Sequence, residues 1–313
     1  MPTTARTQFR SGQNHCAAWI TEPDPALHGE GPHPAVVLVH GFGATHGMRL
    51  AQYEQAFAAA GMVVLAFDFR HLGDSGGSPR QLVSVRRQLN DIDAALDFIR
   101  EDTAVDPARV AVWGTSMGGT HVTLTAANHP ELAAAVVQCP VLNSRNAAFS
   151  SGLRHVAKLA GPITSDLIRA ALHLPRRYLA IADEPGREAI VTVPGARQGW
   201  LGMVSDGVAF DNRVTASVGA ELLLLNAAAK ASEIQIPFLV CVSDHETLMD
   251  PRIAAHVARQ APRGEAIHYP ADHFEVYHAP LAEGIIADQT AFLMRHLGLA
   301  DQVSGQTEQI IDA

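Results

Sequence analysis

A serine flanked by glycines follows directly on an apolar run, in the pattern Gly114-x-Ser116-x-Gly118. The order is a strand-like run at Val110–Trp113, then the serine, then a helix-like stretch at Thr120–Asn128. A serine at such a sharp strand-to-helix turn has a strained backbone, and any Cβ on its glycine neighbours would collide with the adjoining strand or helix. The turn lifts the hydroxyl clear of the sheet. The pattern therefore predicts a nucleophile for acyl chemistry.

Acyl chemistry on a serine develops negative charge on the substrate oxygen, which backbone N–H groups can bind. The N–H of Met117, at the start of the expected helix, points to where this oxyanion forms. A second donor is expected in the loop His40-Gly41-Phe42-Gly43, where two glycines allow a close approach. We predict that the N–H of Phe42 is this donor, and that His40 is a structural hydrogen-bonding residue.

A serine hydroxyl also needs a base to remove its proton and an acid to orient that base. In a strand–helix arrangement these partners follow the serine in the order acid, then histidine. The acid is expected just after the apolar run Phe238–Val242, where Asp244 and Glu246 compete. The histidine is expected after the next short strand, Glu265–Tyr269, and His273 fits this position best.

Two other residues carry misleading signals. Gly73-Asp74-Ser75-Gly76-Gly77 matches the sequence around the nucleophile of chymotrypsin-like proteases, in which base and acid come earlier in the chain, on β-barrels. Only 74 residues precede Ser75, and strand alternates with helix around it, so we interpret Ser75 as a loop residue. Asp272 is discounted as the acid because a sequence neighbour rarely reaches the Nδ1 of its own histidine.

The elements that must position these residues alternate along the chain. Continuous apolar runs are typical of strands buried on both faces, and helical stretches such as Arg86–Arg100 separate them. This alternation predicts an α/β fold with a mostly parallel, doubly wound sheet, whose reactive groups gather beyond the carboxyl ends of the strands. An N-terminal β-hairpin is expected at 7–21. The apolar runs are Ala35–His40, Met62–Phe67, Val110–Trp113, Ala134–Cys139 and Phe238–Val242.

One long stretch, residues 143–232, interrupts this alternation. We interpret it as a helical cap inserted over the active site, with a peripheral decoration as the alternative. The α/β core then comprises residues 1–142 and 233–300, and residues 301–313 form a polar C-terminal tail. The cap is expected to offer an apolar wall to an acyl or alcohol group, and its candidate lining residues are Trp200, Met203 and Phe210.

Composition excludes several functional classes. The 313 residues are 47% hydrophobic and 18% charged with a net charge of −9, which suits a globular enzyme and lacks the basic stripe that nucleic acids require. No apolar run is long enough to span a membrane, and no secretory signal precedes the first strand, so a cytoplasmic location without membrane binding is expected. The three cysteines have no CxxC spacing, and no metal-binding or nucleotide fingerprint occurs. We expect a small-molecule substrate and no metal, cofactor or nucleic acid. The sequence leaves open whether the chain forms a homo-oligomer.

These motifs together resemble the α/β-hydrolase superfamily, over nearly the whole chain. The final segments look like those of bacterial capped serine hydrolases, which are related to the dienelactone-hydrolase-like and X-Pro-peptidase-like branches and to fungal polyketide acyl transferases. The resemblance implies an α/β-hydrolase fold and places the acid at Glu246, although aspartate is much commoner there, so Asp244 stays open. The shared marks are His40–Gly43, Asp68–Ser75, Val105–Val110, Ser116, Glu246, His273–Tyr277 and Asp288–Leu293.

The expected activity is hydrolysis of an ester or thioester of an apolar group, through an acyl-enzyme on Ser116. The same residues could pass the acyl group to an alcohol or amine, or serve a peptidase, an amidase or a C–C bond hydrolase. A catalytically silent binding protein on the same fold is the alternative from another class. A complete set of Ser116, His273 and a carboxylate favours the enzyme, because a binding module needs no base matched to a nucleophile.

Overall fold

The computed structural model describes residues 1–300; the expected tail at 301–313 lies outside the described residues. The chain begins with an antiparallel hairpin of β1 (Thr3–Ser11) and β2 (Asn14–Glu22). Gly12 makes the turn with a φ of 56°, a left-handed conformation that costs glycine little. The hairpin forms the antiparallel edge of the main sheet, because β2 also pairs with β4.

The main sheet has eight strands in the order β1-β2-β4-β3-β5-β6-β10-β11. All pairs from β4 to β11 are parallel, which confirms the expected mostly parallel sheet. The apolar runs form its central strands, and residues 35–39 are completely buried because helices cover both faces. The strand bounds are β3 (His33–Val39), β4 (Val63–Phe67), β5 (Val105–Thr115), β6 (Ala134–Gln138), β10 (Phe238–Ser243) and β11 (Gly264–Tyr269).

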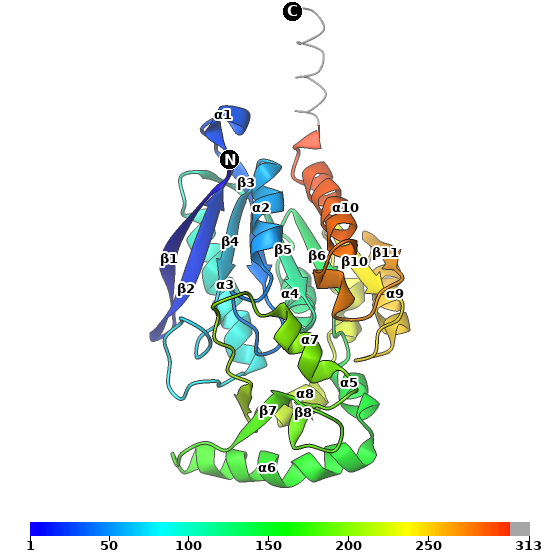
Figure 1. Cartoon of the computed structure of the whole chain (residues 1–313). Helices are drawn as coiled ribbons and strands as arrows, with labels where there is room; N and C mark the ends of the chain where they lie inside the picture. The colour runs from blue at the N-terminus through cyan, green and yellow to red at the C-terminus, as the bar shows by residue number, and fades with distance from the viewer. Residues whose placement is uncertain (301–313) are drawn as a thin grey trace, which may run out of the picture.

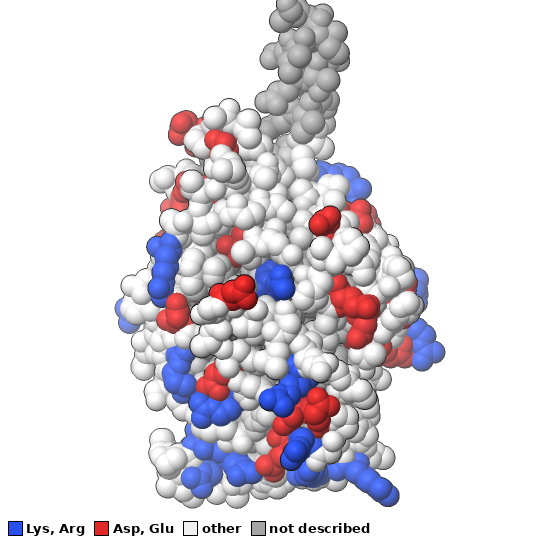
Figure 2. Space-filling model, viewed as in Figure 1, with Lys and Arg blue, Asp and Glu red and all other residues white. Residues whose placement is uncertain are grey.

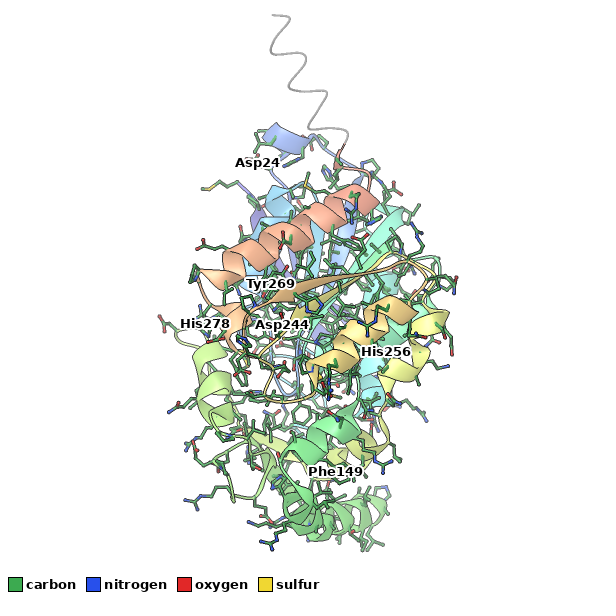
Figure 3. The ribbon with its side chains drawn as sticks, turned by 90° about the vertical axis from the view of Figure 1, so that its right-hand side faces the viewer. Asp24, Phe149, Asp244, His256, Tyr269 and His278 are labelled. Carbon is green, nitrogen blue, oxygen red and sulfur yellow. The ribbon has the colours of Figure 1, made fainter. Side chains whose placement is uncertain are left out.

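Two layers of helices cover the sheet (Figure 1). In one layer α2 (Ala51–Ala59) packs against α10 (Leu281–His296). The other contains α3 (Val85–Arg100), α4 (Met117–Asn128), the 3₁₀ helix η1 (Ala227–Glu233) and α9 (Pro251–Gln260). Seen from the side, α9, marked by His256, and α10 lie on opposite sides of β11, marked by Tyr269 (Figure 3). Two short helices, α1 (Pro25–His28) and η2 (Glu275–Tyr277), lie in loops.

Residues 143–232, here the inserted segment, lie at the carboxyl ends of the parallel strands, opposite the N-terminus (Figure 1). They contain a small sheet of strand order β8-β7-β9 that the sequence patterns did not indicate. Gly152, with a φ of 90°, precedes a helix that begins at Leu153 and continues past Pro162. The elements are α5 (Ser144–Ser150), α6 (Leu153–Ala171), β7 (Tyr178–Ala182), β8 (Ala189–Val191), α7 (Ala196–Met203), β9 (Arg213–Thr215) and α8 (Val218–Leu224).

Charges are mixed over the face shown in Figure 2, and basic side chains gather along its lower edge, over α6. No stripe of a single sign crosses this face. Within residues 1–300, no helix combines the length and apolarity needed to cross a membrane. The three cysteines, Cys16, Cys139 and Cys241, are buried and unpaired.

Candidate active site

The nucleophile position lies on a sharp turn between β5 and α4. Ser116 has φ 55° and ψ −121°, which a non-glycine residue adopts only when its surroundings enforce it. A Cβ on Gly114 would lie 2.5 Å from the carbonyl oxygen of Gly118, and one on Gly118 would collide with the carbonyl of Val39. The glycine spacing thus follows from the closeness of β3, β5 and α4.

Ser116, His273 and Glu246 form a hydrogen-bonded chain. The Nε2 of His273 lies 3.0 Å from the Oγ of Ser116, and its Nδ1 lies 2.8 Å from the Oε2 of Glu246. The side chains of His273 and Glu246 are only 2% and 1% exposed. A buried imidazole between a hydroxyl and a carboxylate can take the hydroxyl proton while the carboxylate stabilises the resulting charge.

The structure brings Glu246, and not Asp244, to this histidine. The second carboxylate oxygen of Glu246 accepts a 2.8 Å hydrogen bond from the N–H of Leu248, which fixes its orientation. Asp244 turns outward and lies 2.7 Å from the Nδ1 of His268, with 42% of its side chain exposed (Figure 3 labels it). Asp244 therefore has no contact with His273, and the alternative acid is displaced to the surface.

Electrostatics distinguish His273 from the buried His40. Burial alone would lower the pKa of His273, but the carboxylate of Glu246 outweighs it, and this pKa is raised well above 6.5. Burial lowers the pKa of His40 to about 4. His40 is therefore neutral, with its Nδ1 3.1 Å from the carbonyl oxygen of Gly41.

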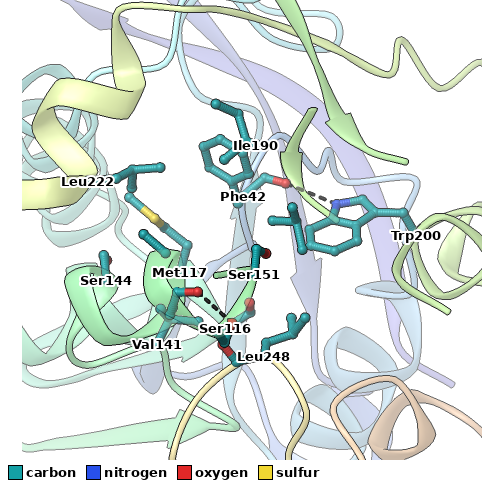
Figure 4. Close-up of a pocket in the computed structure, with 14 residues that line it drawn as sticks. Phe42, Ser116, Met117, Val141, Ser144, Ser151, Ile190, Trp200, Leu222 and Leu248 are labelled. Atoms are coloured by element: carbon teal, nitrogen blue, oxygen red, sulfur yellow. Dashed lines mark hydrogen bonds between the residues drawn. The ribbon is translucent and has the colours of Figure 1, made fainter. Parts of the chain in front are cut away.

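The two expected oxyanion donors lie beside Ser116. A Cβ on Gly41 would lie 3.8 Å from the Oγ of Ser116, so the loop that contains Phe42 reaches the nucleophile. Within residues 1–300, no turn or loop carbonyl accepts a hydrogen bond from the N–H of Phe42 or of Met117. The indole of Trp200 donates a 3.2 Å hydrogen bond to the carbonyl of Phe42 (Figure 4), which fixes this loop.

Two chambers open at Ser116, and we name them by what borders them. The α8 chamber lies between the core and α5, β8 and α8 of the inserted segment (Figure 4). The His273 chamber lies on the imidazole side. Trp200 lines both chambers and Met203 lines the second. Phe210 lines neither, because the loop around it packs over residues 45–48, with Ser205 bonded to Gly47.

The misleading residues have structural partners. The hydroxyl of Ser75 accepts a hydrogen bond from the N–H of Ala17 at 2.8 Å and donates one to the carbonyl of Asp68. Asp272 accepts hydrogen bonds from the backbone and side chain of Thr247. Neither lies in the Ser116–His273 chain. No group of three His, Cys, Asp or Glu side chains within residues 1–300 is arranged to hold a metal ion.

A buried polar contact that sequence analysis missed lies directly beneath the site. The hydroxyl of Tyr277 shares a hydrogen bond with the hydroxyl of Thr115, and the Sγ of Cys139 lies 3.5 Å from the same tyrosine oxygen. The available signal was position, because Thr115 precedes the nucleophile and Tyr277 closely follows His273. Only the fold shows that the two meet.

Comparison with known proteins places this geometry in a family. The model of the family described as serine aminopeptidase, S33, matches residues 30–284. The chain belongs to this family. It is an α/β-hydrolase enzyme, and its serine lies where the fold expects a nucleophile.

Similar proteins extend along most of this hydrolase. The quorum-quenching protein AidA of Acinetobacter baumannii is 35% identical over 92% of this chain and 93% of its own length. A monoacylglycerol lipase of Mycolicibacterium smegmatis is 28% identical over 85% of this chain and 90% of its own. The solved structure of DcsB with its substrate analogue has a TM-score of 0.82 at 19% identity, covers 95% of this chain and 100% of DcsB, and shows the shared fold.

Proposed function

We propose that this hydrolase cleaves a carboxylic ester or thioester through an acyl-enzyme on Ser116. The observation that supports this most is the buried chain of hydrogen bonds from Ser116 through His273 to Glu246. It faces a chamber with mostly apolar walls, as is usual for small-molecule sites.

In the first half of the reaction, the Nε2 of His273 takes the proton of Ser116 as its Oγ attacks the substrate carbonyl. The N–H groups of Met117 and Phe42 bind the oxyanion, and each such donor contributes on the order of 3 kcal/mol in the transition state. The imidazolium then gives its proton to the leaving oxygen or sulfur as the carbonyl–leaving-group bond breaks. The acid fragment stays on Ser116 as an ester.

In the second half, water attacks this ester and gives its proton to His273. The carbon–Oγ bond breaks, Ser116 regains the proton, and the acid is released. Glu246 accepts the Nδ1–H of His273 throughout, which holds the reactive tautomer and stabilises the imidazolium. The inserted segment acts as a cap, because α5, α7, β8 and α8 form walls of the chamber beside Ser116.

The chamber walls favour esters over peptides with a free amino terminus. An aminopeptidase must neutralise the substrate ammonium group, for which a carboxylate is the natural partner. Among the described residues that line the two chambers, none is Asp or Glu. A similar protein is named a monoacylglycerol lipase, which supports ester cleavage. Because another is named a quorum-quenching protein, quorum-sensing signals with a carbonyl ester bond belong among the test substrates.

The test compares the wild-type protein with Ser116→Ala and with Ser232→Ala, which changes an exposed serine outside both chambers. Matched p-nitrophenyl esters, thioesters and anilides are assayed, and intact-protein mass spectrometry detects the acyl-enzyme. We expect ester and thioester turnover in the wild type and Ser232→Ala and none in Ser116→Ala. Equal turnover in Ser116→Ala would reject the mechanism. Product analysis with added alcohol or amine separates hydrolysis from acyl transfer.

A further inference from the structure

Ser116 lies in the wall between the α8 chamber and the His273 chamber. Both are lined by Phe42, Ser116 and Trp200, so the two cavities meet at the nucleophile. A substrate whose carbonyl carbon is at Ser116 must place its acyl part in one chamber and its leaving group in the other. The question is which part enters which chamber.

The position of the base that transfers the proton determines which part of the substrate enters which chamber. After Ser116 has attacked, His273 must protonate the leaving atom, which therefore lies within hydrogen-bond reach of Nε2. His273 lines the chamber named after it and, among the described residues, is absent from the lining of the α8 chamber. The leaving group thus belongs on the His273 side, and the acyl group must extend the opposite way.

A third cavity adjoins the α8 chamber, and Ser116 does not line it. This α6 chamber shares Ala148, Ile190 and Leu222 with the α8 chamber. Its further walls include Leu159 and Ile163 of α6, with His155 as its polar lining residue. These three shared residues, here called the junction, lie between the two apolar spaces.

The opposite side is more confined. The His273 chamber is smaller than the α8 chamber, and large side chains such as Met48, Leu50 and Met203 line it. Trp200 separates the two sides and is fixed by its hydrogen bond to Phe42 and by edge contact with Phe274, with ring centroids 5.2 Å apart. These two contacts hold Trp200 in place between the two chambers.

We propose that the acyl group of the substrate occupies the α8 chamber and passes the Ala148–Ile190–Leu222 junction into the α6 chamber, while a compact, uncharged leaving group occupies the His273 chamber. The substrate class is then an ester or thioester of a long, unbranched aliphatic acid. The inference rests on the proposed acyl-enzyme mechanism and adds the direction in which the substrate lies.

The experiment uses two series of esters with the full-length protein. One series holds p-nitrophenol constant and varies the acid from acetate through octanoate to dodecanoate. The other holds the octanoyl group constant and varies the alcohol from methyl to octyl. For the wild type we expect kcat/KM to rise about fourfold with each acyl methylene that becomes buried, and to fall as the alcohol lengthens.

Variants on each side of Ser116 separate the chambers. Ala148→Phe and Leu222→Trp obstruct the junction, and each should lower the dodecanoate-to-acetate ratio of kcat/KM at least tenfold without moving the alcohol-length ratio. Met203→Ala widens the His273 chamber and should raise the relative rate of longer alcohols without moving the acyl-length ratio. These ratios are independent of the fraction of folded enzyme, so partial misfolding does not imitate the result.

Two failures are distinguishable. In the first, turnover depends on Ser116, but neither Ala148→Phe nor Leu222→Trp changes the acyl-length ratio, or the effects of the two kinds of variant are exchanged between the series. This result overturns the assignment of the chambers, while the mechanism stands. Absence of Ser116-dependent turnover with every ester and thioester overturns the proposed function itself, and the assignment with it.

Discussion

The hydroxyl of Thr115, the residue before the nucleophile, lies 2.5 Å from the hydroxyl of Tyr277, which follows His273 in the same loop. Both groups are buried, and the hydrogen bond joins the end of β5 to η2. Because Ser116 and His273 come from segments far apart in the chain, such a tie controls the distance between them. We therefore predict that Tyr277 is a positioning residue.

Tyr277→Phe removes this tie while keeping the ring. We expect kcat for ester hydrolysis to fall between about tenfold and a hundredfold with KM unchanged, because a small displacement of the base slows proton transfer more than it weakens substrate binding. Steady-state kinetics on a p-nitrophenyl ester measure both constants.

Tyr269→Phe is the matched control, because the hydroxyl of Tyr269 donates a 2.9 Å hydrogen bond to Asp288, outside both chambers. Both variants should lose roughly 1 kcal/mol of unfolding free energy in urea, but only Tyr277→Phe should change kcat. A kcat that is equal in the two variants would contradict a positioning role.

The acid of the proposed catalytic chain is testable at two neighbouring carboxylates. Glu246→Gln should lower kcat by roughly 10⁴-fold, because the amide no longer stabilises the imidazolium or the reactive tautomer. Asp244→Asn should leave kcat near the wild-type value, since Asp244 contacts the exposed His268. Kinetics of the two purified variants decide, and a larger loss in Asp244→Asn would reject the assignment.

The raised pKa of His273 predicts the acidic limb of the pH profile. The imidazole must be neutral to accept the serine proton, so kcat/KM should fall as pH decreases through a pKa that lies above 6.5. In Glu246→Gln the carboxylate that raises this pKa is gone while burial still lowers it, so the residual activity should extend to lower pH. Profiles of kcat/KM between about pH 5 and pH 10 test the direction of the shift. A shift to higher pH would show that Glu246 does not raise the pKa.

Two helical glycines, Gly118 at the nucleophile turn and Gly284 in α10, should respond in opposite ways to substitution by alanine, as measured by the free energy of unfolding. Gly118→Ala should destabilise the protein by about 3 kcal/mol or more, because its Cβ meets the carbonyl of Val39 in the centre of the sheet. Gly284→Ala, on the exposed side of α10 with no atom within 4 Å of the new Cβ, should stabilise it by about 0.5–1 kcal/mol. Chemical unfolding measures both, and a stable Gly118→Ala protein would contradict the packing described at the turn.

The local sequence was enough to predict the turn at Ser116 and the sheet beneath it, because short-range steric contacts allow few residue types at such a turn. A strand, a glycine-flanked serine and a helix have a single compact arrangement, and the structure has this arrangement with Gly114 and Gly118 in close contact. The apolar runs likewise predicted the parallel sheet, since strands buried on both faces cannot carry alternating polar residues. His273 followed from its place after the last strand.

Tertiary structure alone brings Glu246, and not Asp244, to His273, and it alone forms the chamber walls. The two carboxylates belong to one loop, and they meet histidines that lie 27 and 24 residues further along the chain. Glu246 contacts His273 and Asp244 contacts His268, and these pairs form only after folding. Trp200 and Phe210 are equally apolar in sequence, yet the packing of the surrounding loops places only Trp200 beside Ser116. The pairing of Thr115 with Tyr277 has the same origin, since spacing along the chain does not specify which buried hydroxyls meet across a sheet.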